Sequence, residues 1–147
     1  MTLSLDLQLR PSARAHHWLF WLHALPLVML PLAMASGPLM LALAFGIGAS
    51  WLWLRRHPAF GYGPKALVRL RAESEGGWLL VRRSGQRVEA VLSQDSYMQA
   101  RIMILNFRNA EGARFTRIIL GDETTDEGLR RLRVRLAAGV AKKETAA

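Results

Sequence analysis

Histidine is the side chain in this sequence best suited to acid–base or metal chemistry, and its positions limit that chemistry. His16, His17, His23 and His57 lie in or beside a long apolar segment, and none follows His57. The chain has no cysteine, so thiol catalysis, disulfides and cysteine-ligated metals are excluded. The domain expected from residue 65 onward has no histidine and therefore cannot form a Ser-His-Asp triad or a histidine metal site. We therefore predict that the protein is not an enzyme and has no catalytic, cofactor-binding or metal-binding residues.

Other residues that could do chemistry have structural explanations. The carboxylate pairs Asp122-Glu123 and Asp126-Glu127 precede a helical pattern, and negative charge is favourable at a helix N-terminus. The sequence lacks a phosphate-binding loop, and Gly61-x-Gly63 is too short for a dinucleotide fingerprint. An ionisable residue in a membrane span is a candidate site by default, but His23 at shallow depth can stay neutral and bond to a carbonyl. We expect all of these residues to be structural.

Arginine is the remaining candidate for a binding function. From Lys65 onward there are 16 Lys and Arg against 10 Asp and Glu, a balance of +6. Anionic phospholipids attract such segments by about 1 kcal/mol per basic residue near the membrane surface, and an acidic protein would be steered to the same face. Nucleic acid is not expected, because no binding module is recognisable. A solvated face without a ligand is the other alternative. The candidate partner- or lipid-binding residues are Arg130, Arg131, Arg133 and Arg135.

An uncharged stretch determines where these residues act. The 40 residues from Ala15 to Leu54 contain no Lys, Arg, Asp or Glu. A bilayer core needs roughly 20 apolar residues per helical crossing, so the stretch predicts two crossings. Ala35-Ser36-Gly37-Pro38 supplies a turn near its middle. We predict a helical hairpin of about Trp18–Met34 and Leu39–Leu54.

The flanks of the hairpin predict its orientation. Arg10 and Arg14 precede it and Arg55 and Arg56 follow it, whereas the turn has no basic residue. The positive-inside rule then places both termini in the cytoplasm. Two tryptophans near each end of the hairpin agree, because indole rings favour the membrane interface. We predict a multi-pass protein of the cytoplasmic membrane.

Small residues recur every four positions along the second predicted helix, at Ala42, Gly46 and Ser50. Such a stripe lets helices approach closely inside a bilayer. It could pack two chains into a homodimer or pack the two helices of one hairpin. We favour packing within the hairpin.

The segment that follows has the pattern of a small sheet and one helix. Short apolar runs separated by turn residues predict five strands: 66–72, 78–83, 87–92, 101–107 and 114–120. Leu129, Leu132 and Leu136 then lie on one helical stripe, and Thr124-x-x-Glu127 fits a capping box at its start. The predicted fold class is a membrane α-helical hairpin of two transmembrane helices plus a small α+β cytoplasmic domain. That domain has about five antiparallel strands and a C-terminal helix.

This pattern gives four parts. They are a cytoplasmic N-terminal segment (1–14), a two-helix transmembrane hairpin (15–56), a basic cytoplasmic β-rich domain with a C-terminal helix (65–141), and a tail (142–147).

Several short motifs occur in an order that is typical of one family. They are Leu9-Arg10-Pro11-Ser12, His23-Ala24, Trp78-x-Leu80, Asp95-Ser96-Tyr97, Leu105-Asn106-Phe107-Arg108, and Asp122 followed by 129–136 (LRRLRVRL). With the hairpin, this order resembles the YgfX/CptA-like proteins, the membrane-bound toxin component of a bacterial toxin–antitoxin pair. Gly128 departs from the pattern, because a larger residue is expected in the first turn of that helix; glycine weakens a helix by about 1 kcal/mol against alanine.

The resemblance implies an inner-membrane toxin that inhibits assembly of the cytoskeletal proteins FtsZ and MreB and so changes cell shape and division. It also implies a small acidic partner of the SdhE/CptB type. The residues themselves support a tethered, non-catalytic binding protein. Its alternatives are a membrane-tethered scaffold or anionic-lipid-binding module, and an assembly factor for a membrane complex.

Overall fold

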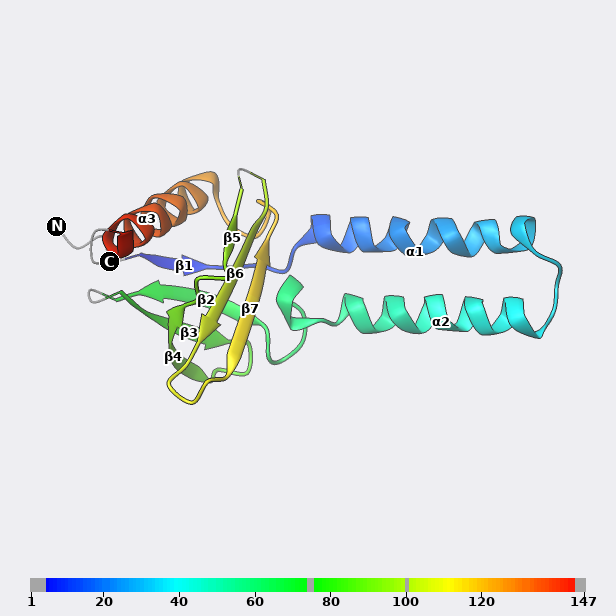
Figure 1. Ribbon diagram of the computed structural model, residues 1–147, viewed down its shortest axis with the longest axis horizontal. Coiled ribbons are helices and arrows are strands. Elements are labelled where there is room, and N and C mark those ends of the chain that lie inside the picture. The colour runs from blue at the N-terminus through cyan, green and yellow to red at the C-terminus, as the bar shows by residue number, and fades with distance from the viewer. Residues whose placement is uncertain (1–4, 74–75, 100, 145–147) are drawn as a thin grey trace.

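Two long helices project from one end of a β-rich body (Figure 1). The computed structural model describes residues 5–73, 76–99 and 101–144. Helices α1 (Ala13–Ala33) and α2 (Pro38–Arg55) lie antiparallel and side by side; we call them the hairpin. Residues 5–12 and 57–144 form the β-domain. Pro38 starts α2 at a position where its missing N–H leaves no hydrogen bond unmade.

The β-domain contains a seven-stranded antiparallel sheet. Strands β1 to β4 and then β6 are neighbours in that order, and both β5 and β7 pair with β6. A short 3-10 helix, η1 (Pro58–Phe60), connects α2 to the sheet, and α3 (Asp126–Glu144) ends the described chain. The strands are β1 (Asp6–Gln8), β2 (Leu67–Ala72), β3 (Gly77–Arg82), β4 (Arg87–Leu92), β5 (Tyr97–Met98), β6 (Met103–Arg108) and β7 (Arg114–Ile119).

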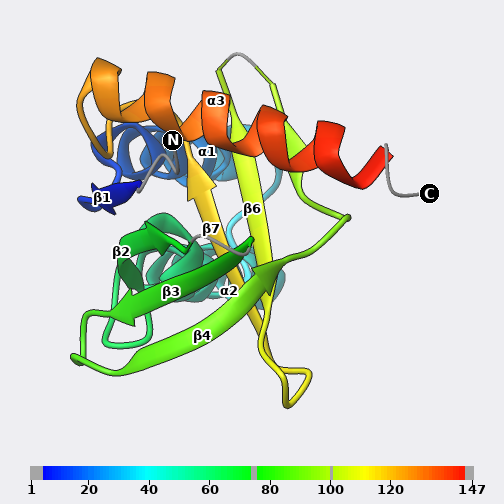
Figure 2. The same cartoon turned by 90° about the vertical axis from the view of Figure 1, so that its left-hand side faces the viewer.

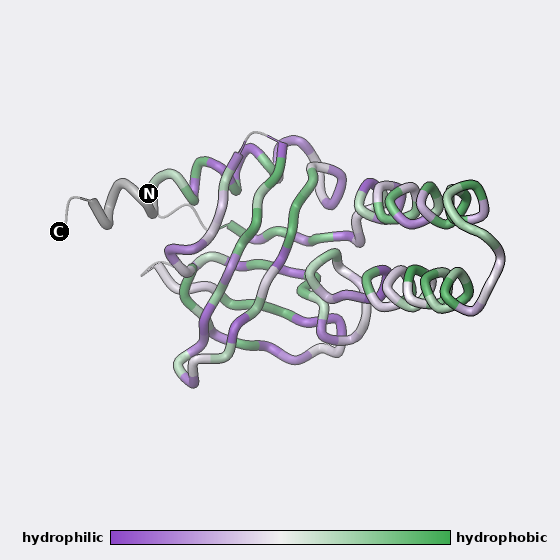
Figure 3. Tube along the Cα trace, turned by 45° about the vertical axis from the view of Figure 1, so that its right-hand side comes forward, coloured by the Kyte–Doolittle hydropathy of each residue, from purple (hydrophilic) through white to green (hydrophobic). Residues whose placement is uncertain are grey.

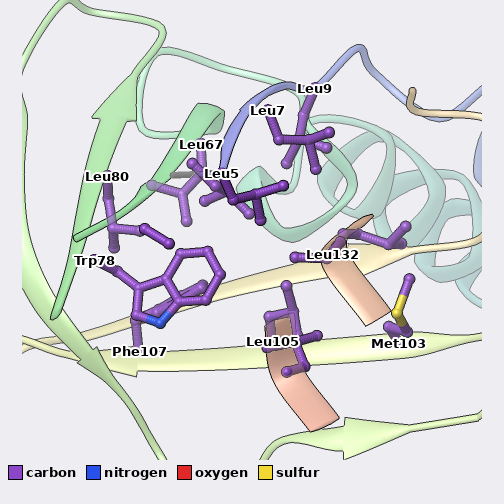
Figure 4. Packing of buried hydrophobic residues seen from close by; sticks show 14 of the residues in the cluster. Leu5, Leu7, Leu9, Leu67, Trp78, Leu80, Met103, Leu105, Phe107 and Leu132 are labelled. Atoms are coloured by element: carbon purple, nitrogen blue, oxygen red, sulfur yellow. The ribbon is translucent and has the colours of Figure 1, made fainter. Parts of the chain in front are cut away.

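Helix α3 closes the core on the side of the β-domain away from the hairpin (Figures 1 and 2). Leu132 and Leu136 are almost fully buried. Around them pack inward-facing side chains of the sheet (Figure 4), and this burial is the main stabilising contribution to the domain. The buried cluster comprises Leu5, Leu7, Leu9, Leu67, Leu70, Ala72, Trp78, Leu80, Ala90, Met103, Leu105, Phe107, Phe115, Ile119, Leu129, Leu132 and Leu136.

The predicted strand count was too low. All five predicted strands are present with shifts of one or two residues at their ends, and the antiparallel sheet and C-terminal helix are confirmed. The two additional strands are β1, from the predicted N-terminal segment, and the two-residue β5. In β1 the side chains of Leu5, Leu7 and Leu9 are buried while those of Asp6 and Gln8 are exposed, which is the alternation of a half-buried strand.

The start of α3 also differs from the prediction. The hydroxyl of Thr125, not that of Thr124, accepts the N–H of Gly128, so the expected capping box is wrong. Glu127 bonds to arginines of its own helix instead. A Cβ at Gly128 would lie 2.7 Å from Cδ1 of Leu7. Glycine at this position therefore allows α3 to pack closely on β1.

The expected tail, 142–147, is continuous with α3 as far as Glu144. Residues 1–4 of the expected N-terminal segment and 145–147 of the tail lie outside the described residues.

Candidate functional site

The hairpin is built mostly from hydrophobic residues (Figure 3), and many of its large apolar side chains are exposed. The side chains of Leu32 and Phe45 are each 79% exposed, although both are large and apolar. Soluble monomers rarely expose contiguous apolar patches above a few hundred Å². A pair of helices that is apolar outside has the surface expected of a lipid-facing element.

The two helices differ in how well they fit a membrane span. Among the described residues one helix, α2, is long and apolar enough to cross a membrane by length and composition. Helix α1 is longer, but it contains three histidines and Pro26 and Pro31, which lower its hydropathy. The predicted hairpin of two transmembrane helices is therefore confirmed as a pair of packed helices but not as two crossings.

A polar contact joins the two helices. His23 Nδ1 lies 2.7 Å from the carbonyl oxygen of Leu19, and its Nε2 lies 3.3 Å from the hydroxyl of Ser50. A carbonyl can only accept, so Nδ1 carries the proton and Nε2 accepts from Ser50. The contact fits the structural role expected for His23, because each polar atom has a partner between apolar helices.

The small-residue stripe mostly faces away from α1. Ala42 and Gly46 are exposed, and a Cβ at Gly46 would meet nothing within 4 Å. Ser50 alone of the three bonds across the hairpin, to His23. The half-buried residues of α2 lie on another face, which includes Met40, Ala44 and Ile47. Of the packing within the hairpin that we favoured, the structure shows only the contact of Ser50, and packing against a second chain stays the alternative hypothesis.

The hairpin is attached to the β-domain through Ser12, the residue that caps α1. The Ser12 hydroxyl donates to Oδ1 of Asp122 at 2.7 Å and accepts the N–H of Ala15 at 3.0 Å. The N–H of Arg14 donates to Oδ2 of Asp122 at 2.7 Å, and the Tyr62 hydroxyl donates to the Ser12 carbonyl at 3.0 Å. The start of α1, the loop before α3 and the segment after α2 thus meet at one buried residue.

The electrostatics of this junction favour an ionised Asp122. Burial alone would raise the pKa of Asp122, but hydrogen bonds from the Arg14 N–H and the Ser12 hydroxyl outweigh it and lower the pKa below its usual value. The charge of Arg14 acts in the same direction. A carboxylate that accepts two hydrogen bonds is held in its charged form.

A buried arginine lies beneath the same junction. Arg117 of β7 is fully buried, and its Nη2 donates to the Arg10 carbonyl at 2.6 Å. Burial lowers the pKa of Arg117, and Glu123 opposes that shift. Glu123 is itself fully buried and accepts three backbone N–H groups. A Cβ at Gly61, which has φ of +91°, would overlap the Arg117 guanidinium, so the chain leaving α2 packs directly on this arginine.

Helix α3, which carries the four arginines, lies on the side of the β-domain away from the hairpin (Figure 1). Arg130 and Arg131 both bond to Glu127, with Nε–Oε distances of 2.8 Å. These bonds lower the pKa of Glu127 to about 2. Arg135 donates to the carbonyl of Glu73, and Arg133 is exposed. The four predicted residues are thus on one helix, and at least three are held by local partners.

Sequence reasoning did not identify the junction residues as a group. Ser12 precedes a helix and could have been recognised as an N-cap, but nothing local links it to Asp122 or Arg117. Among the described residues no group of three His, Asp or Glu could hold a metal ion.

The geometry agrees with the comparisons with known proteins. A family model described as the membrane-bound toxin component of a toxin–antitoxin system matches residues 4–139. The chain belongs to this family. No curated protein and no solved structure matches the chain.

The family match covers the hairpin and the β-domain together, from before β1 into α3. The recognition made from the sequence motifs is therefore confirmed. Membership makes the chain a membrane-bound toxin component, which agrees with the apolar surface of the hairpin, and a toxin–antitoxin component implies a partner.

Proposed function

We propose that this chain is a non-catalytic toxin anchored in the bacterial inner membrane, and that its β-domain binds a filament-forming cytoskeletal protein of the FtsZ or MreB type and blocks its assembly. Both helices of the hairpin cross the bilayer, and both termini are cytoplasmic. A small acidic protein of the SdhE/CptB type is the expected antitoxin-like partner. Family membership supports the toxin role, and the positive flanks of the hairpin support the orientation.

The position of α3 relative to the hairpin favours a protein partner over a lipid partner. The hairpin leaves one end of the β-domain, and the basic helix α3 lies at the other end (Figures 1 and 2). If the hairpin is in the bilayer, α3 lies on the side of the β-domain away from the membrane, and Arg130 and Arg131 are exposed on that helix. Electrostatic attraction to headgroups is screened over about 8 Å at physiological ionic strength. These arginines are placed to meet a cytoplasmic protein.

The hydrogen bonds at the junction support a mechanism in which the β-domain binds its partner while it is held at the membrane by the hairpin. Asp122 fixes the β-domain to the start of α1 by accepting hydrogen bonds from the Ser12 hydroxyl and the Arg14 backbone N–H. A rigid attachment holds the binding surface at a constant height and orientation above the membrane, which lowers the entropic cost of binding a filament that grows along it.

The experiment measures polymerisation of a purified FtsZ-type or MreB-type protein with the full chain in nanodiscs. Inhibition that depends on the concentration of the chain supports the proposal. Empty nanodiscs are the control, and unchanged polymerisation at saturating chain would refute it. Flotation of liposomes with the chain held in nanodiscs tests the lipid alternative, which requires capture of the chain by the liposomes that rises with anionic lipid and falls with salt.

A further inference from the structure

A groove runs between the outer edge of β1 and the beginning of α3. Its volume is about 500 Å³, which is within the range of 300–1,000 Å³ typical of ligand sites. One wall is β1 itself, the floor is the loop 122–125, and the other wall carries Glu127, Gly128 and Arg131. Asp122 of the junction and Arg131 of α3 are among the residues that line the groove.

The backbone of β1 presents unpaired groups to this groove. Leu9 N–H bonds to the Val68 carbonyl and Ala72 N–H to the Leu5 carbonyl, each at 2.8 Å. Residues that exchange bonds alternate with residues that do not in an antiparallel pair. Asp6 and Gln8 therefore direct their N–H and C=O groups away from β2 and toward the groove. Among the described residues these groups have no hydrogen-bond partner.

The chain itself shows that this edge can accept a neighbouring backbone. Arg10 is the next residue of the same alternating set, and its N–H donates to the carbonyl of Glu123 at 2.7 Å. Beyond Glu123 the chain turns away into α3, which leaves the edge open at Gln8 and Asp6. An extended segment entering the groove would continue the pairing that Glu123 begins.

The carboxylates of Asp6, Asp122, Glu123 and Glu127 line the groove together with Arg10 and Arg131. These carboxylates are all hydrogen-bonded within the chain, so the charge of Arg10 at the closed end of the groove is the one that favours an acidic group on the segment. The exposed guanidinium of Arg10 has no hydrogen bond or ion pair to the part of the chain that the structure describes. Arg131, on the opposite wall, shares Glu127 with Arg130. A carboxylate at the end of the segment would complete the coordination of Arg10.

We infer that this groove binds an extended, acidic-ended segment of a protein partner, which adds as a strand to β1. The inference rests on the proposed function only in assuming that the partner is a protein. Main-chain hydrogen bonds to Asp6 and Gln8 supply the pairing, as in other cases of strand addition to a sheet edge. The Arg10 guanidinium sets the direction of the bound segment.

A second copy of the chain does not fit as the occupant. Strand β1 continues into α1 and runs in the direction of the hairpin (Figure 1). Two copies inserted the same way into one membrane would have their β1 strands pointing in the same direction. That arrangement excludes the antiparallel pairing used throughout this sheet.

The test uses proline to remove a single main-chain donor. In Gln8→Pro the lost N–H is the one that points into the groove, so pairing with β2 is kept, and proline is tolerated on edge strands. The matched control is Gln8→Ala, which removes the same side chain and keeps the N–H. The probe is a fluorescent, N-acetylated six-residue peptide that begins with glutamate and continues with alternating threonine and valine, because antiparallel pairing places the first residue of the bound segment beside Arg10. Its binding to the full chain in nanodiscs is followed by anisotropy.

We expect the wild type and Gln8→Ala to bind the peptide equally and Gln8→Pro to bind about tenfold more weakly. Arg10→Glu should weaken binding of the same peptide and reduce its salt dependence. Equal binding by Gln8→Pro and Gln8→Ala, or no binding by the wild type, would overturn the inference.

Hydrogen exchange provides a readout that needs no variant. In the wild-type chain the Gln8 amide should exchange fast without peptide and become protected when peptide is bound. Unchanged exchange at Gln8 in the presence of bound peptide would overturn the inference, as would a dimer that Gln8→Pro dissociates.

Peptide binding without inhibition of polymerisation would support the groove and refute the proposed function. Inhibition of polymerisation without peptide binding would support the proposed function and refute peptide binding in the groove.

Discussion

The hydroxyl of Ser12 donates a hydrogen bond of 2.7 Å to Oδ1 of Asp122, a residue 110 positions away along the chain. Ser12 caps the first helix of the hairpin, and Asp122 lies in the loop before α3. The contact therefore holds the start of the membrane anchor against the loop that leads into the helix closing the core of the β-domain. A change at this contact should affect both.

Replacing Asp122 with asparagine should make the stability of the β-domain less dependent on pH. The folded pKa of Asp122 lies below the unfolded value of 3.8, so its stabilising effect is fully present above that value and is lost as the pH falls through the folded pKa. At pH 7 we expect Asp122→Asn to be less stable by about 1 kcal/mol. Denaturant unfolding followed by near-ultraviolet circular dichroism from pH 7 to pH 2 measures the difference. A difference that stayed constant below pH 4 would contradict the assignment.

Gly61→Ala should destabilise the junction much more than Gly85→Ala. Both glycines have positive φ, +91° and +86°, so alanine costs about 1 kcal/mol of backbone strain at either position. At Gly85 a Cβ would meet nothing within 4 Å, whereas at Gly61 it would overlap the guanidinium of Arg117. The difference between the two variants in free energy of unfolding isolates the contact with Arg117. Equal effects would show that the chain can move away from this arginine at little cost.

Leu132→Asp should unfold the β-domain. Leu132 is fully buried in the core, and an unpaired charge there costs more than about 4 kcal/mol. Val134→Asp is the matched control on the same helix, because Val134 is 47% exposed and a surface substitution usually changes stability by about 0.5 kcal/mol or less. Limited proteolysis of the chain in nanodiscs distinguishes the two. A protease-resistant Leu132→Asp domain would mean that α3 contributes little to the fold.

Reversing the charges of Arg130 and Arg131 to Glu should leave folding nearly unchanged, since exposed ion pairs contribute little. The pKa of Glu127, lowered to about 2 by these two arginines, should rise above its usual value, which NMR titration measures. If the arginines form the binding face, inhibition of polymerisation should be lost. Arg108→Glu with Arg114→Glu changes net charge by the same amount elsewhere on the surface. If the variant with Arg130→Glu and Arg131→Glu still inhibits polymerisation, the α3 arginines are solvated and do not bind the partner.

The position of the termini can be tested with reporters that are active only in the periplasm. A reporter fused after Ala147 should be silent, and one inserted between Ser36 and Gly37 should be active. An inactive insertion at Ser36 would indicate that the chain does not cross at its turn. Activity after Ala147 would contradict every argument for a cytoplasmic partner.

Most elements of the fold could be predicted because they are determined by local patterns. The period of apolar residues identified five strands and the helix with Leu129, Leu132 and Leu136, and the uncharged stretch identified the hairpin. Strand β1 was missed although Leu5, Leu7 and Leu9 alternate with polar residues, because a three-residue strand next to a long apolar segment has a weak signal. The capping residue was misplaced by one position because adjacent threonines are equally suitable from sequence.

The amino-acid sequence by itself determined the composition of the hairpin, the positive charge around it, the order of the elements and the family. These depend on hydropathy and on residue order, which act over a few positions at a time. Only the tertiary structure decided that Ser12 meets Asp122, that Arg117 is buried against Gly61, and that α3 lies on the side of the β-domain away from the hairpin. Such contacts depend on how strands distant in the chain pair and on which sheet edge stays open. Local propensity does not determine that choice, because it results from burying one shared core.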